Sequence, residues 1–220
     1  MFVCEPDRLC FPPIENADDD GILAIGGDLS VERLLLAYRS GIFPWYEEGQ
    51  PIIWWSPDPR FVLFPDRLRV SKSMQRILRS DRFRNTWDED FPTVIKYCRH
   101  IPRDDQDGTW ITPQMDIAYC ALHEEGHAHS VEVWQGDELV GGLYGVIVGR
   151  CFCGESMFST VPNASKFALI KLAESLESKG IEIIDSQVSN PHMTSMGAEL
   201  IPRARYLTYL DVSRGSGSAS

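Results

Sequence analysis

The segment from Ser130 to Val188 constrains the fold more than any other part of the chain. Two alternating runs, SVEVWQG and ELVGGLYGVIVG, are joined by Gly136-Asp137, a pair typical of β-hairpin turns. A third strand-like run (CFCGESMF), a helix ending at Gly180 and a returning strand (IEIIDSQV) follow. Antiparallel strands followed by a helix and a returning strand predict an α+β fold with a mixed sheet.

The first half of the chain predicts shorter elements. A loop over residues 11–20 precedes a short strand, and Ser30 is placed to cap a helix that stops at Ser40-Gly41. An aromatic- and proline-rich loop leads to the strand FVLF, which Pro65 closes. The pattern further predicts helices over residues 71–80, 91–100 and 112–126 and around 193–196.

Composition excludes several classes of protein. The chain has 220 residues, 43% hydrophobic and 24% charged, which is typical of a soluble globular protein with a real core. Its apolar runs are too short for a membrane helix, and its start lacks the pattern of a secretory signal. Six cysteines lack metal-ligand or redox spacing, so we expect free thiols and a cytoplasmic location.

The net charge of −11 argues against general affinity for nucleic acid. Basic residues nevertheless gather in one stretch, which holds eight of the 21 in 25 positions. Such a run is often only a solvated helix face, but in an acidic chain it is a candidate for phosphate contacts. The candidates are Arg60, Arg67, Arg69, Lys72, Arg76, Arg79, Arg82 and Arg84.

The IEIIDSQV strand carries a carboxylate and an amide two positions apart. Regular alternation puts Asp185 and Gln187 on one face, roughly 6–7 Å apart at the backbone. A buried carboxylate needs a partner, and the amide can donate an N–H while its oxygen stays free to accept. The pair is therefore a candidate for handling protons, although a strand that runs into a loop produces the same pattern. Upstream, Glu155 lies among Phe152, Met157 and Phe158, which suggests a ligand with a positive or polar group.

Several blocks then occur in a specific order from about Phe11 to Leu210. They include WWSPDPR, GTWIT, GESMFS, NASK, IDSQV and IPRARYL. In this order the chain resembles the bacterial leucyl/phenylalanyl-tRNA–protein transferase family. The resemblance implies a small N-terminal domain (1–62), a catalytic domain similar to the GCN5-related N-acetyltransferase fold (63–212) and a flexible tail (213–220).

The resemblance also implies an activity. The enzyme would move leucine or phenylalanine, and possibly methionine, from aminoacyl-tRNA to the α-amine of proteins that begin with Arg or Lys, which marks them for degradation. Arg150 and Gly154 are wrongly spaced for the phosphate loop of an acetyl-CoA enzyme. We therefore expect neither a cofactor nor a metal, and a carrier other than coenzyme A.

Roles for particular residues follow from the resemblance. Asp185 and Gln187 would be catalytic: Asp185 would hold the Gln187 amide, whose oxygen would accept a proton from the attacking amine. The residues that surround the donor would be Trp45, Trp110, Phe152, Glu155 and Leu172. Family members carry an aromatic residue where this chain has Leu172, so the preference among leucine, phenylalanine and methionine stays open.

Strict alternation would place Phe152 and Glu155 on opposite faces, although both are expected in one pocket. A β-bulge at Cys153-Gly154 would reconcile them, because an extra residue resets the parity of a strand. We predict such a bulge.

Two other classes of function stay open. His123 and His127 match the H-E-x-x-H motif of zinc hydrolases, but Gly126 is placed to end the helix before both histidines share a face. The basic run would also suit a non-catalytic RNA-binding module. Tryptophans are core residues by default, and the acid that meets the acceptor's basic side chain, Glu132, Asp137 or another, stays open.

Overall fold

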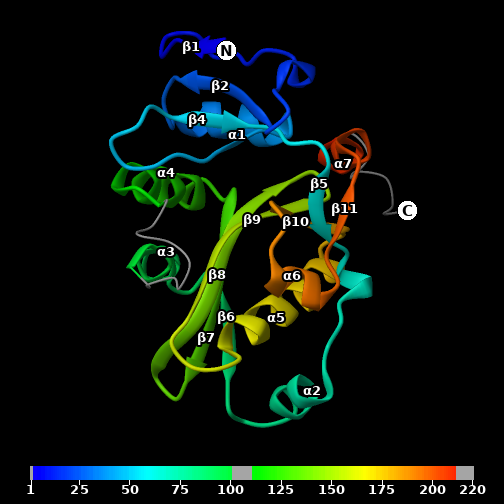
Figure 1. The fold of residues 1–220 in the computed structure, drawn as a ribbon. Helices are drawn as coiled ribbons and strands as arrows, with labels where there is room; N and C mark the ends of the chain where they lie inside the picture. Colours follow the sequence, from blue (N-terminus) through cyan, green and yellow to red (C-terminus); the bar gives the residue numbers. More distant parts are fainter. Residues whose placement is uncertain (1, 101–110, 212–220) are drawn as a thin grey trace, which may run out of the picture.

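The computed structural model describes residues 2–100 and 111–211 and contains two sheets (Figure 1). The smaller sheet has the order β1-β2-β4-β3. It is accompanied by helix α1 (Val31–Arg39), which Ser30 caps by accepting a hydrogen bond from the backbone N–H of Arg33, as predicted. Its strands are β1 (Phe2–Cys4), β2 (Ile22–Gly26), β3 (Phe43–Pro44) and β4 (Ile53–Trp55), and a short 3₁₀ helix spans Ile14–Asn16.

The larger sheet has seven strands in the order β11-β5-β10-β9-β8-β7-β6. Every neighbouring pair is antiparallel except β9 with β10, which is parallel. The predicted α+β class with a mixed, mainly antiparallel sheet is therefore confirmed. The strands are β5 (Arg60–Leu63), β6 (Arg84–Trp87), β7 (Ala128–Gln135), β8 (Glu138–Val148), β9 (Cys151–Ser159), β10 (Ile183–Gln187) and β11 (Glu199–Ile201).

Helices cover both faces of this sheet (Figure 1). Helix α5 (Ala164–Ser178) packs on β7, β8 and β9 from one side, while α3 (Phe91–His100) and α4 (Pro113–Glu124) contact them from the other. The remaining helices are α2 (Lys72–Leu78), α6 (Pro191–Met196), α7 (Arg203–Leu210) and the 3₁₀ turn Pro65–Arg67. The predicted helices and the hairpin at Gly136-Asp137 are confirmed, whereas strands β1, β6 and β11 and helix α7 were not predicted.

The hydrophobic core has two parts, one on each side of the larger sheet. One part lies under α5 and includes Phe167 and Leu172. The other joins the α3/α4 face to the smaller sheet and includes Trp54, Phe91 and Tyr144. The smaller sheet therefore shares a core with the larger one.

The expected boundary between residues 62 and 63 falls inside strand β5. That strand belongs entirely to the larger sheet, between β10 and β11. The division into 1–62, 63–212 and a tail stays a prediction, and the tail lies outside the described residues. Within the described ranges, every helix is too short or too polar to span a membrane.

Candidate active site

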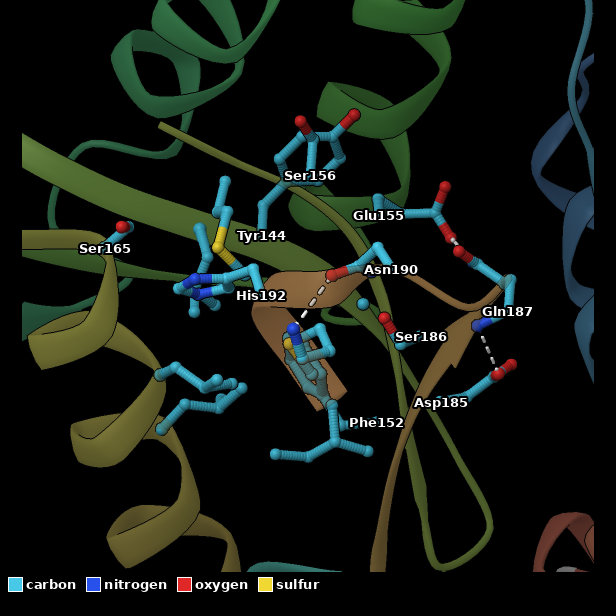
Figure 2. A pocket seen from close by; sticks show the side chains of 17 residues that line it. Tyr144, Phe152, Glu155, Ser156, Ser165, Asp185, Ser186, Gln187, Asn190 and His192 are labelled. Carbon is cyan, nitrogen blue, oxygen red and sulfur yellow. Dashed lines mark hydrogen bonds between the residues drawn. The ribbon is translucent and has the colours of Figure 1, made fainter. Parts of the chain in front are cut away.

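Strands β9 and β10 diverge near the middle of the larger sheet. Their parallel pairing ends at Cys153 and Asp185, while β9 continues to Ser159. A cavity of about 450 Å³ lies there (Figure 2). Residues of β8, β9, β10, α5 and α6 line it, so the strand divergence creates room for a ligand.

The predicted bulge exists, one residue later than expected. On β8, Gly145 pairs with Gly154 and Tyr144 pairs with Ser156, so Glu155 is the extra residue. The change of parity places both Phe152 and Glu155 at the cavity.

A second bulge interrupts β10. Opposite β5, Asp185 pairs with Val62 and Gln187 pairs with Phe61, which leaves Ser186 as the extra residue. Gln187 has a φ of 59°, in the left-handed region that residues other than glycine rarely adopt. The expected regular alternation from Asp185 to Gln187 is therefore wrong.

This bulge changes how Asp185 and Gln187 meet. Asp185 Oδ1 accepts a hydrogen bond from the backbone N–H of Gln187 at 2.8 Å. The side-chain Nε2 of Gln187 donates instead to Glu155 Oε1, at 3.1 Å. Figure 2 shows Gln187 between the two carboxylates. The prediction that Asp185 holds the side-chain amide is wrong, because the bulge turns that side chain toward Glu155.

Arg60 is the main partner of Asp185. Its Nε lies 2.9 Å from Oδ1 and its Nη2 lies 2.7 Å from Oδ2, and the two side chains are only 1% and 0% exposed. Arg60 was a candidate for tRNA contact; this is wrong, since its guanidinium is buried and already ion-paired. Burial by itself lowers the pKa of Arg60, but the Asp185 carboxylate outweighs this, and the pKa lies above its ordinary value.

Glu155 sits in a polar cluster that sequence reasoning missed. Its carboxylate accepts hydrogen bonds from the hydroxyls of Tyr38 at 2.7 Å and Tyr119 at 2.9 Å, and these hydroxyls also contact each other closely. Burial raises the pKa of Glu155 to about 7, although the hydrogen bonds from the tyrosines and Gln187 oppose the shift. The tyrosines belong to α1 and α4, so no local motif reveals them.

Most of the other residues that line the cavity are apolar. Leu172, the expected side-chain contact, lines it at 1% exposure. His192 also lines it, across from Gln187 (Figure 2). The Nε2 of His192 is buried and has no hydrogen-bond partner within the described ranges. Sequence reasoning also missed His192, whose only available signal was its place in the first turn of α6, two residues after the capping Asn190. The apolar residues that line the cavity are Leu143, Phe152, Met157, Leu169, Leu172, Ile184 and Met193.

The structure does not place either of the two predicted tryptophans at the cavity. Trp45 is half-buried just after β3, 5.5 Å from the ring of Trp55, and it is not among the residues that line the cavity. Trp110 lies outside the described residues. The structure therefore brings together five predicted residues at the cavity: Phe152, Glu155, Leu172, Asp185 and Gln187.

The other basic candidates lie on the surface, on α2 and the segments next to it. Helix α2 is at the end of the molecule opposite the smaller sheet (Figure 1) and contacts α5. The exposed candidates are Arg67, Arg69, Lys72, Arg76, Arg79, Arg82 and Arg84.

The remaining motifs lie away from the cavity. Helix α4 ends at Glu124, as Gly126 predicted, so His127 is outside it; His123 stacks on Phe91. In the described part of the chain, no group of three His, Cys, Asp or Glu side chains is placed to hold a metal ion. Glu132 is fully buried and accepts hydrogen bonds from Thr86 and Ser130, so it is not accessible to an acceptor.

Comparison with known proteins assigns this arrangement to a class, the transferases. The family model described as "Leucyl/phenylalanyl-tRNA protein transferase" matches residues 62–211, and the model of that family's N-terminal domain matches residues 27–58. The chain belongs to the leucyl/phenylalanyl-tRNA–protein transferase family and is an enzyme.

Full-length relatives agree with the family models. A leucyl/phenylalanyl-tRNA–protein transferase of Christiangramia forsetii is 53% identical, over 96% of this chain and 100% of its own. One of Azotobacter vinelandii is 55% identical, over 96% and 94%. Among solved structures, a GCN5-related N-acetyltransferase from Kribbella flavida is similar with a TM-score of 0.43 and 9% identity, over 76% of this chain and 58% of its own.

Proposed function

We propose that this enzyme transfers an aminoacyl group from aminoacyl-tRNA to the α-amine of a protein. The donor is leucyl- or phenylalanyl-tRNA, and the acceptor begins with Arg or Lys. Transfer marks the acceptor for degradation, in the cytoplasm. The observation that carries the proposal is the hydrogen bond between Gln187 and Glu155 at the edge of an apolar cavity.

The cavity suits the side chain of the donor. Its apolar contacts would bury a leucine or phenylalanine side chain, a gain of about 1.5–3 kcal/mol. The resemblance implies an aromatic residue at the position of Leu172, so the pocket of this chain would have a different shape, and we include methionine among the proposed donor side chains. Trp45 and Trp110 would contact the terminal adenosine, and the exposed basic residues near α2 would contact the backbone of the acceptor stem.

The chemistry needs orientation more than a strong base. The amine nitrogen forms a bond to the ester carbonyl carbon, the bond to the ribose oxygen breaks, the amine loses a proton and the ribose oxygen gains one. An α-amine has a pKa of about 7.7–8.0, so part of it is neutral at pH 7. Correct placement of the reactants then supplies much of the acceleration.

Gln187 is the residue that we place at the reacting amine. Its Nε2 is occupied by Glu155, which directs the amide oxygen away from Glu155 and leaves it free to accept. That oxygen accepts a hydrogen bond from the attacking amine. Glu155 orients the amide, and Asp185, whose oxygens bind Arg60 and the Gln187 backbone, positions Gln187 and takes no proton.

The test mixes the purified protein with leucyl-tRNA and a peptide that begins with arginine, and measures the peptide's gain of leucine. Gln187→Ala should lower the rate by about 100-fold, the lower range for proton-transfer groups. Gln50→Ala, in an exposed loop, is the matched control. A peptide that begins with alanine tests acceptor choice. Absence of transfer by the native enzyme, or full activity of Gln187→Ala, would refute the proposal.

A further inference from the structure

Arg60 does not line the cavity, but its buried guanidinium makes ring, hydrogen-bond and ion-pair contacts with several elements. Its guanidinium carbon lies 4.6 Å from the ring centres of both Phe43 and Tyr206. Its Nη1 donates to the carbonyl oxygen of Gly41 at 3.2 Å, and its other nitrogens bind Asp185. These contacts come from the smaller sheet, from α7 and from β10, so one buried side chain joins three parts of the fold.

Tyr206 adds a second donor to the same carboxylate. Its hydroxyl donates to Asp185 Oδ2 at 2.8 Å, and the tyrosine is fully buried. Asp185 Oδ2 therefore accepts from Arg60 and Tyr206, while Oδ1 accepts from Arg60 and the backbone of Gln187. Donors converge on both oxygens, which fixes the orientation of the carboxylate.

The backbone of Gln187 needs such support. A residue other than glycine with a positive φ has a strained backbone, which persists only where its surroundings impose it. The hydrogen bond from its N–H to Asp185 Oδ1 is the contact that ties this backbone to the buried cluster. A carboxylate that rotated or lost its partners would release that N–H, and the side chain of Gln187 would leave the position facing Glu155.

We infer that Arg60 and Tyr206 are positioning residues for aminoacyl transfer, which act through Asp185 to hold the bulged backbone of Gln187. The inference rests on the proposed function, since it assigns the effect to the amide of Gln187. It also means that Gly41 and Phe43, which precede the larger sheet in the chain, support catalysis through their contacts with Arg60.

The experiment is a double-mutant cycle between Tyr206→Phe and Gln187→Ala. Tyr206→Phe keeps the ring that stacks on Arg60 and removes only the hydroxyl. The kcat and the KM for leucyl-tRNA are measured with an arginine-initiated peptide for all four proteins, and circular dichroism melting checks that each is folded. Tyr209→Phe, on the same helix and away from the cavity, is the matched control.

We expect Tyr206→Phe to lower kcat by about 10-fold, as for loss of a hydrogen bond to a charged group, with KM for the donor unchanged within about 2-fold. In the Gln187→Ala background the same change should have almost no effect, because the positioned group is absent. A general loss of folded enzyme would instead lower both backgrounds equally.

Equal effects in the two backgrounds, or no effect of Tyr206→Phe on the native enzyme, would overturn the inference. If Tyr206→Phe does not fold, Arg60→Lys replaces it in the same double-mutant cycle, and the same two results would overturn the inference. Lysine keeps the positive charge but loses the bidentate contact with Asp185. Failure of the proposed function is separate, because the native enzyme would then transfer no leucine at all.

Discussion

The side-chain Nε2 of Gln187 donates a hydrogen bond of 3.1 Å to Glu155 Oε1, across the opening between β9 and β10. Each residue stands at a bulge: Glu155 is the extra residue of β9, and Gln187 follows the extra residue of β10. Two irregularities in neighbouring strands therefore turn two polar groups toward each other, where regular strands would point at least one of them elsewhere.

The pH dependence of transfer should report on Glu155. Burial raises its pKa from an ordinary 4.5 to about 7, and only its ionised form accepts the hydrogen bonds of Tyr38, Tyr119 and Gln187 together. We expect kcat to rise with pH through about 7, with a second rise from the acceptor amine near a pKa of about 7.7–8.0. Steady-state kinetics from pH 5.5 to pH 9 measure both.

Glu155→Gln is the control for that profile. It should lose the rise near pH 7 and keep the one that belongs to the amine. The free energy of unfolding of the native protein should instead fall as the pH rises. Because the pKa of Glu155 is higher in the folded than in the unfolded protein, protonated Glu155 stabilises the fold below about pH 4.5. This contribution is lost as the pH rises through about 7. An unchanged profile in Glu155→Gln would contradict the assignment.

Gly145→Ala should displace Phe152. A Cβ atom at position 145 would lie 2.3 Å from the backbone oxygen of Cys153 and 2.6 Å from Cε1 of the Phe152 ring, so both the β9 backbone and the ring must shift. We expect a loss of about 1–3 kcal/mol in the free energy of unfolding from overpacking. The KM for leucyl-tRNA should rise about 10-fold, because a wall of the cavity shifts.

Gly49→Ala is the comparison for that variant. Gly49 has a positive φ, unlike Gly145, and a Cβ there meets no atom within 4 Å, so this variant reports the cost of backbone strain without a clash. Thermal melts and kinetics of the two variants are measured together. A Gly145→Ala enzyme with native KM would show that Phe152 does not contact the donor.

His192 should contribute to binding of the donor. Burial and the nearby charge of Lys166 lower its pKa, so the ring is neutral at pH 7, and its buried Nε2 needs a partner. His192→Phe keeps a flat ring and removes that atom; we expect the KM for leucyl-tRNA to rise about 10-fold. His100→Phe, at the exposed end of α3, should leave KM unchanged. An unaltered KM in His192→Phe would exclude contact with the donor.

The exposed basic residues near α2 should make the affinity for tRNA depend on salt. Replacing both Arg76 and Arg79 with Glu removes two candidate phosphate contacts. The slope of log Kd against log salt concentration, measured by filter binding, should then fall by about 0.9 per lost contact. Arg39→Glu, exposed on α1, is the matched control, and an equal slope in both variants would argue against a role for α2.

The sequence carried much of the fold in its local patterns. Alternation and the Gly136-Asp137 turn predicted the β7–β8 hairpin, and Ser30 marked the start of α1, because these signals act over a few residues. The parity conflict between Phe152 and Glu155 even predicted a bulge, although not its exact residue. Strand β6 and helix α7 carried no comparable signal.

The chain alone determined which residue types were available: an acid and an amide two positions apart, a glutamate among aromatics and a run of basic residues. Tertiary structure decided their partners, since burial and contacts between distant segments set a side chain's neighbours. It paired Asp185 with Arg60 rather than with the Gln187 amide, and removed Arg60 from the surface. It also brought Tyr38 and Tyr119, from two separate helices, onto Glu155, which no spacing along the chain encodes.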